Sequence, residues 1–165
     1  MRKRIFIELL EEHEKVNIYS IRHEGEEFSE FEKFLLSHKE GYRKDLGVLS
    51  YRLDRIIQDG VFERHFRYEG KMKDRVSAIP SHFDVSNLRV YCICLTEKII
   101  ILGTGCIKKT RTYNENILLD KIVVLMQEID SLIRLKERAG NIKCIGNSIC
   151  GELFIDIDFD KEIIL

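Results

Sequence analysis

The chain has 165 residues, of which 44% are hydrophobic and 33% charged, and its formal net charge is -1. This composition excludes a disordered chain, and the length suits one domain with a sizeable core. The apolar runs are too short to span a bilayer, and the basic residues 2–4 precede only a brief apolar patch, so we expect neither an anchor nor a signal peptide. Five cysteines without recurrent spacing favour reduced thiols and a cytoplasmic location.

The first third of the chain predicts two strands and two helices. Alternation of apolar and polar residues indicates β segments at residues 4–9 and 16–23, although a helical turn fits residues 4–9 equally well because Leu9, Leu10 and the acidic run after them do not alternate. After Gly25 the apolar spacing becomes helical, and residues 26–59 are expected to form a helical hairpin with a break near residues 39–42. Gly60 follows the last apolar pair of this segment, where a left-handed C-cap is typical.

The middle of the chain predicts a run of strands. Residues 61–68 alternate and are expected to form one strand, and residues 74–82 form a weaker one in which Pro80 favours either an edge position or the end of the strand. Residues 88–95 and 98–107 are the clearest pair, and the tight connection between them indicates a hairpin. Both faces of residues 88–95 are apolar, which indicates a central strand.

The last third predicts a long amphipathic helix, capped by Asn114 and ending at Gly140, followed by one more strand over residues 153–159. Consecutive strands joined by hairpins favour a small antiparallel sheet with helices packed on it, in the α+β class. We find no linker and no internal repeat, so residues 1–165 are interpreted as a single domain.

Familiar catalytic motifs are missing from the sequence. There is no Walker phosphate loop, dinucleotide glycine fingerprint, nucleophile elbow or His-Glu-x-x-His zinc motif. Cys92 and Cys94 lie within an apolar strand, and Cys144 and Cys150 lack the spacing of zinc knuckles, so buried thiols are the preferred interpretation. We therefore expect no metal and no cofactor.

Positive charge is concentrated in the middle of the chain. Residues 61–112 contain ten Lys and Arg against five acidic residues, whereas the rest of the chain contains 17 basic and 23 acidic residues. Such a basic segment is typical of a surface that binds a polyanion, although charges scattered over a solvated surface remain the alternative. Neighbouring strands could gather one cationic, aromatic-lined face from His65, Arg67, Arg89, Tyr91, Lys108, Lys109, Arg111 and Tyr113. A cationic site of this kind can cleave RNA without a metal.

Four motifs appear here in a recognisable order. Leu88-Arg89-Val90-Tyr91 opens a strand, residues 98–102 form an apolar strand, Ile107-Lys108-Lys109-Thr110 follows, and a helix begins near Asn114. This order resembles the C-terminal half of RelE/HigB-type toxins of bacterial type II toxin–antitoxin systems, including phage-derived relatives. Upstream, "FERHFRYEG" resembles a family strand and places Arg67 at a matching position, and "GEEFSEFEKFLL" resembles the family's first helix. The likeness covers about residues 16–139.

The resemblance implies a compact fold with helices on a small antiparallel sheet, and a ribosome-dependent, metal-independent mRNA endonuclease. Its partner would be a cognate antitoxin, expected to have a helix-turn-helix. The catalytic candidates are Arg67, Arg89, Lys108 and Lys109, and the candidates for RNA binding are His65, Tyr91, Arg111 and Tyr113. N-terminal and C-terminal extensions, the latter at residues 140–165, would lie outside the toxin-like core. The alternative is a non-catalytic interaction module of the same fold that binds a protein partner.

Overall fold

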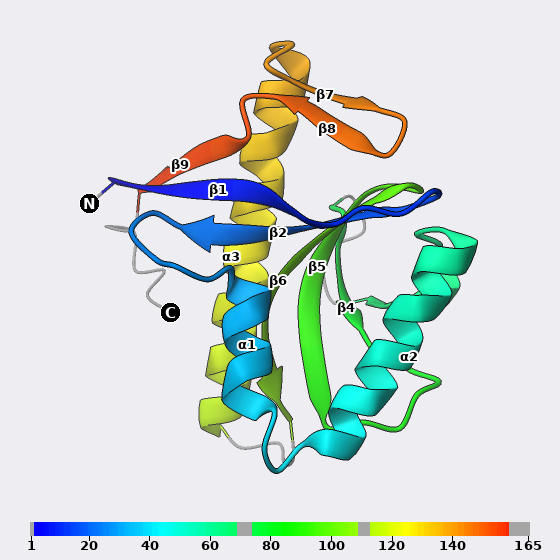
Figure 1. Ribbon diagram of the computed structural model, residues 1–165. Coiled ribbons are helices and arrows are strands. Elements are labelled where there is room, and N and C mark those ends of the chain that lie inside the picture. The colour runs from blue at the N-terminus through cyan, green and yellow to red at the C-terminus, as the bar shows by residue number, and fades with distance from the viewer. Residues whose placement is uncertain (1, 69–73, 109–112, 159–165) are drawn as a thin grey trace.

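The computed structural model describes residues 2–68, 74–108 and 113–158 (Figure 1). In chain order the elements are β1 (Arg2–Glu11), β2 (Asn17–His23), α1 (Glu30–His38), α2 (Arg43–Asp59), a 3-10 helix (Glu63–His65), β3 (Arg67–Tyr68), β4 (Val76–Ile79), β5 (Leu88–Thr96), β6 (Ile99–Ile107), α3 (Tyr113–Arg138), β7 (Ile142–Ile145), β8 (Ser148–Gly151) and β9 (Phe154–Asp158).

The main sheet has seven strands in the order β3-β4-β5-β6-β2-β1-β9. Strands β2 and β6 run parallel, and every other neighbouring pair is antiparallel. The α+β class is therefore confirmed, but the expectation of a small, wholly antiparallel sheet is wrong. The reason is the long connection from β2 to β6, which includes α1 and α2 and is long enough for the crossover that parallel pairing requires.

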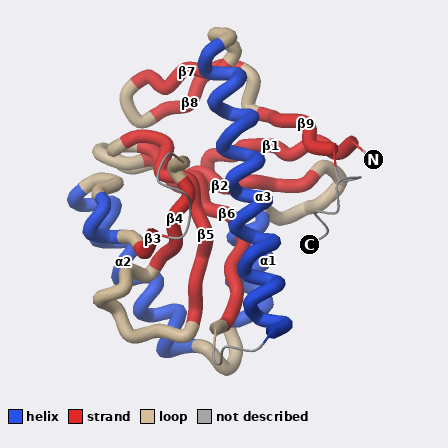
Figure 2. Tube along the Cα trace, turned by 180° about the vertical axis from the view of Figure 1, so that it is seen from behind, coloured by secondary structure: helices blue, strands red, loops and turns tan. Residues whose placement is uncertain are grey.

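Helices cover both faces of this sheet. Figure 1 shows α1 and α2 on one face, and Figure 2, seen from behind, shows α3 crossing the other. Strand β5 serves both layers, because Tyr91 and Ile93 belong to the apolar cluster under α3, whereas Val90 and Cys92 belong to the cluster under α1 and α2. The two-faced apolar pattern of residues 88–95 is thus explained by a central strand between two helical layers.

The predicted helical hairpin is present as α1 and α2, with the break at residues 39–42. Helix α1 begins at a capping box, in which the Ser29 hydroxyl accepts from the Glu32 N–H at 3.2 Å and the Glu32 carboxylate accepts from the Ser29 N–H at 3.1 Å. Helix α2 ends at Gly60, whose φ of 122° is positive as expected, although its ψ of 171° is not that of a left-handed cap.

The single strand expected over residues 61–68 is not formed. A 3-10 helix occupies Glu63–His65, and only Arg67–Tyr68 pairs with β4. The local turn is held by hydrogen bonds from the His65 N–H to the Phe62 carbonyl oxygen (3.0 Å) and from the Phe66 N–H to the Glu63 carbonyl oxygen (3.1 Å). His65 and Arg67 therefore do not share a strand face.

The C-terminal third agrees with the predicted long helix and final strand. Helix α3 ends shortly before Gly140, whose φ is 79°, and β9 pairs with β1 at the edge of the main sheet. The hairpin β7–β8 was not predicted. Its turn residue Asn147 donates to the His13 carbonyl oxygen (2.7 Å), and the Ile149 N–H donates to the Tyr19 hydroxyl (2.9 Å). These contacts attach residues 140–158 to the N-terminal strands.

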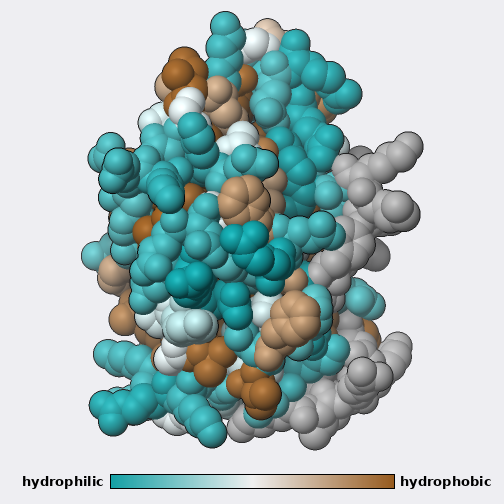
Figure 3. Space-filling view, turned by 90° about the vertical axis from the view of Figure 1, so that its right-hand side faces the viewer, coloured by the Kyte–Doolittle hydropathy of each residue, from teal (hydrophilic) through white to brown (hydrophobic). Residues whose placement is uncertain are grey.

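The surface beside α2 is mainly hydrophilic, with separate hydrophobic patches (Figure 3). Scattered apolar residues of this kind are ordinary on a protein surface. Across residues 2–68, 74–108 and 113–158, no helix is both long enough and apolar enough to cross a membrane.

The glycines of the "GTG" segment in β6 allow the helices on both faces to pack closely. A Cβ at Gly105 would lie 2.4 Å from the Arg89 carbonyl oxygen and 2.9 Å from ring atoms of Phe34 in α1. A Cβ at Gly103 would lie 2.6 Å from the sulfur of Met126 in α3. This glycine pair therefore has a packing role.

We expect Gly105→Ala to lower the free energy of unfolding by about 2 kcal/mol, because overpacking a filled site displaces backbone or side chains. Gly47→Ala is the matched control, since this exposed position in α2 has nothing within 4 Å of an added Cβ. That control is expected to be more stable by up to about 1 kcal/mol. Urea denaturation of both variants checks the pair, and equal effects would contradict the packing account.

Candidate functional site

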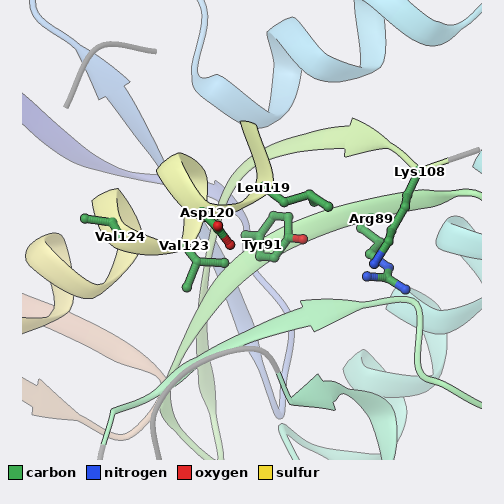
Figure 4. Close-up of a pocket in the computed structure, with 7 residues that line it drawn as sticks. All are labelled: Arg89, Tyr91, Lys108, Leu119, Asp120, Val123 and Val124. Atoms are coloured by element: carbon green, nitrogen blue, oxygen red, sulfur yellow. The ribbon is translucent and has the colours of Figure 1, made fainter. Parts of the chain in front are cut away.

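A pocket of about 620 Å³ lies between α3 and one end of the β5–β6 pair, where β5 begins and β6 ends (Figure 4). Its volume is in the range of small-ligand sites. The residues that line it come from both strands and from the helix: Arg89, Tyr91, Lys108, Leu119, Asp120, Val123 and Val124.

The strand register explains why the cationic residues converge. Arg89 is paired with Cys106 across β5 and β6, and directly paired residues project to the same face of a sheet. Lys108 follows Cys106 by two positions and therefore continues on that face. Its N–H donates to the Asn87 carbonyl oxygen at 2.6 Å, which extends the ladder beyond the last assigned pair.

Two positive charges gather at one end of the pocket. Figure 4 shows the side chains of Arg89 and Lys108 with their nitrogen atoms directed to the same region. Within the described part of the chain, the Lys108 ammonium makes no hydrogen bond or ion pair. Two cations directed to one region make this end of the pocket attractive to an anion.

A carboxylate and an apolar wall form the other end of the pocket. The Asp120 carboxylate is directed towards the Tyr91 ring in Figure 4, and the wall of α3 is made by Leu119, Val123 and Val124. Sequence reasoning did not select Asp120. The signal that could have indicated it is its place beside the apolar stripe of the long helix, next to Leu119.

Tyr91 lies at the base of the pocket. The residue is 0% exposed, and its ring belongs to the apolar cluster under α3. This burial does not fit the expected role of Tyr91 as a platform on which a base stacks. The ring instead separates Asp120 from the two cations, with its hydroxyl directed towards Arg89 and Lys108 (Figure 4).

Arg67 is not among the residues that line this pocket. It is paired with Ala78, which is paired with Tyr91, so the three project to the same face of the sheet. Its guanidinium donates to the Ser81 carbonyl oxygen at 3.3 Å. The predicted catalytic set is therefore only partly brought together, with Arg89 and Lys108 in one pocket and Arg67 on the edge strand.

His65 contacts α2, the helix that covers the face of the sheet opposite to the pocket. Its Nε2 lies 3.1 Å from the Asp59 carboxylate, and its Nδ1 lies 3.0 Å from an Arg52 Nη1. An arginine can only donate, so Nδ1 accepts and Nε2 carries the proton. Arg52 also binds the Asp84 carboxylate through two 2.9 Å hydrogen bonds. The residue is 2% exposed, so the expected RNA contact of His65 does not fit, and its role here is structural.

His65 makes stability depend on pH. Burial, and then the positive charges of Arg52 and Arg64, lower the pKa of His65 below its usual value of about 6.5. The folded state therefore binds this proton more weakly than the unfolded state. Stability from the neutral ring is fully present above about pH 6.5 and is lost as the pH falls below it.

We expect the free energy of unfolding of the wild type to fall as the pH is lowered from about 7 to about 5, and that of His65→Gln to fall less over the same interval. Glutamine can accept from Arg52 or donate to Asp59 without titrating. Urea denaturation at several pH values measures both slopes. Parallel curves would show that another group carries the dependence.

The remaining predicted residues lie at or beyond the limits of the described chain. Lys109 and Arg111 lie outside the described residues, and of Tyr113 the structure gives only its place as the first residue of α3. Among the residues that the structure describes, no three His, Cys, Asp or Glu side chains lie close enough together to hold a metal ion.

Comparisons of this chain with protein-family models, with curated proteins and with solved structures give no match. Evidence about function therefore comes from the pocket and from the sequence motifs around it.

Proposed function

We propose that this chain is a toxin-like, RelE/HigB-type endoribonuclease that cleaves mRNA in the cytoplasm, in association with the ribosome and without a metal. The observation that carries the proposal is the convergence of Arg89 and Lys108 in one pocket. These residues belong to the motifs on which the toxin resemblance depends. Two cations directed to one region suit a phosphodiester, which carries one negative charge on its free oxygens.

The chemistry would be an internal displacement on the RNA. The 2′-hydroxyl attacks the adjacent phosphorus and loses its proton to a base, the bond to the 5′-oxygen breaks, and the products are a 2′,3′-cyclic phosphate and a 5′-hydroxyl. The Lys108 ammonium suits protonation of the leaving 5′-oxygen, and the Arg89 guanidinium suits stabilisation of the charge on the phosphorane. Arg67, on the edge strand β3, would then contact a neighbouring phosphate rather than the reacting one, while Lys109 stays a catalytic candidate by the resemblance alone.

The proposal includes a cognate antitoxin, for which the resemblance implies a helix-turn-helix protein. Phe83 and Val85, between β4 and β5, are 75% and 92% exposed and supply apolar side chains that a partner could cover. An adjacent small gene for such an antitoxin would support this part of the proposal.

Induced expression in a bacterial host tests the function, with growth followed and the 5′ ends of cellular mRNA mapped. Growth arrest with new 5′ ends inside translated messages would support the nuclease. Unimpaired growth with intact mRNA would contradict it and favour a non-catalytic module that binds a protein partner.

A further inference from the structure

Two charged side chains of the pocket, Lys108 and Asp120, do not pair with each other. Over the described ranges, the carboxylate of Asp120 has no hydrogen bond and no ion pair, and Lys108 has no ion pair. Opposite charges in one pocket normally pair if they can reach each other. Here the Tyr91 ring lies between them in Figure 4, so the two ends of the pocket are suited to different groups of one ligand.

The three parts of the pocket have distinct chemical preferences. The end formed by Arg89 and Lys108 prefers an anion, the wall of Leu119 and Val123 prefers a flat apolar surface, and Asp120 prefers hydrogen-bond donors. A nucleotide combines an anion, a flat ring and donors on the ring edge. Bases of single-stranded RNA can be read in this way because their Watson–Crick edges are free.

We propose that this pocket binds a guanine nucleotide of single-stranded RNA, with Asp120 reading the Watson–Crick edge of the base while Arg89 and Lys108 hold a phosphate. This inference rests on the proposed function, because it takes RNA to be the ligand.

Guanine is the base that fits a carboxylate on chemical grounds. Its Watson–Crick edge carries two adjacent donors, N1–H and the N2 amino group, which match the two oxygens of one carboxylate in a bidentate pair. Adenine and cytosine each place a ring acceptor beside the amino group, and uracil places its single N–H between two carbonyl oxygens. In these three bases an acceptor would face a carboxylate oxygen.

The experiment measures binding of short single-stranded RNAs that differ only in the central base, which is guanine, hypoxanthine, adenine, cytosine or uracil. Deoxyribose at the central and flanking nucleotides prevents cleavage, and fluorescence anisotropy gives the dissociation constants. We expect the guanine RNA to bind about tenfold more tightly than the adenine, cytosine and uracil RNAs. The hypoxanthine RNA, which lacks the N2 amino group, should be intermediate.

Asp120→Asn and Glu128→Gln separate base reading from charge. Both substitutions remove one negative charge from α3, but Glu128 is exposed and does not line the pocket. Asp120→Asn should abolish the guanine preference, because the asparagine amide presents one acceptor and one donor to guanine N1–H and the N2 amino group, which are both donors. Glu128→Gln should keep the preference and change all five affinities equally.

The possible failures are distinguishable. Equal wild-type binding of all five RNAs, or an Asp120→Asn variant that keeps the guanine preference, would overturn the base assignment and leave the proposed RNA-binding function standing. Failure of the wild type to bind any of the five RNAs would overturn the assignment of this pocket to RNA, and the base assignment with it, whereas the proposed function is overturned by intact mRNA on induced expression.

Discussion

Replacing both Arg89 and Lys108 by alanine is expected to lower the rate of mRNA cleavage at least about 100-fold. Removing one donor that stabilises developing charge typically costs a factor of about 10² to 10³, and losing a positioned proton donor costs about 10² to 10⁴. Because both groups would act on one phosphate, their effects should not multiply fully. Primer extension on a message translated in a purified system measures the rate.

Lys98→Ala is the matched control for this double variant. Lys98 is an exposed lysine in the turn between β5 and β6, at the opposite end of the two strands from Arg89 and Lys108. The Lys98→Ala variant lacks one positive charge but has an unaltered pocket, so it should cleave mRNA at the wild-type rate. Cleavage by a folded Arg89→Ala, Lys108→Ala variant at the wild-type rate would contradict the assignment of the site.

Arg75→Met is expected to cause the largest loss of stability, about 3 kcal/mol. Asp130 of α3 is 1% exposed, and its carboxylate accepts from the Arg75 Nε at 2.7 Å and from the Arg75 backbone N–H at 3.1 Å. The same guanidinium donates to Glu137 at 2.9 Å. Methionine would leave a buried carboxylate without its main counter-charge, although the backbone N–H of residue 75 and the Arg134 guanidinium would still donate to it.

Two further variants isolate this buried pair. Arg134 also reaches the Asp130 carboxylate at 3.3 Å, but its side chain is 42% exposed, so Arg134→Met should cost less than about 1 kcal/mol. Combining Arg75→Met with Asp130→Leu should recover much of the stability, because the uncompensated charge is then gone. Urea denaturation measures all three variants. A double variant no more stable than Arg75→Met alone would indicate that packing, rather than charge, dominates.

Elements with strong local patterns could be predicted from the sequence. The spacing of Phe31 and Phe34 predicted α1, and the stripe along residues 118–133 predicted α3. The alternation in residues 88–95, apolar on both faces, predicted a central strand. In each case the pattern repeats within one segment, so no knowledge of distant partners is needed.

Features that depend on distant partners could not be predicted. Residues 61–68 alternate like a strand, but Asp59 and Arg52 hold His65 beside α2, and a 3-10 helix forms instead. The parallel pairing of β2 with β6 depends on where the chain returns after α2, which periodicity does not encode. The hairpin β7–β8 is short, and its attachment through Asn147 is a tertiary contact.

In the candidate site, too, features set by local patterns could be predicted and features set by distant partners could not. The proximity of Arg89 and Lys108 could be predicted from the sequence because adjacent, hairpin-connected strands have a predictable register. The presence of Asp120 in the same pocket could not be predicted, because α3 and the sheet meet only in the tertiary structure. Tyr91 was placed on the right strand face, but its burial under α3 depends on the helix that covers that face.

The central claim is that Arg89 and Lys108 contact RNA phosphates, and the salt dependence of RNA binding tests it most directly. The affinity for one short single-stranded RNA would be measured between about 50 and 200 mM salt for the wild type and for the Arg89→Ala, Lys108→Ala variant. Each phosphate neutralised on a single strand contributes about 0.7 to the slope of log affinity against log salt. Because both residues act on one phosphate, the slope for the variant should be shallower by about 0.7. Identical slopes would show that the two residues do not bind phosphate and would contradict the proposed site.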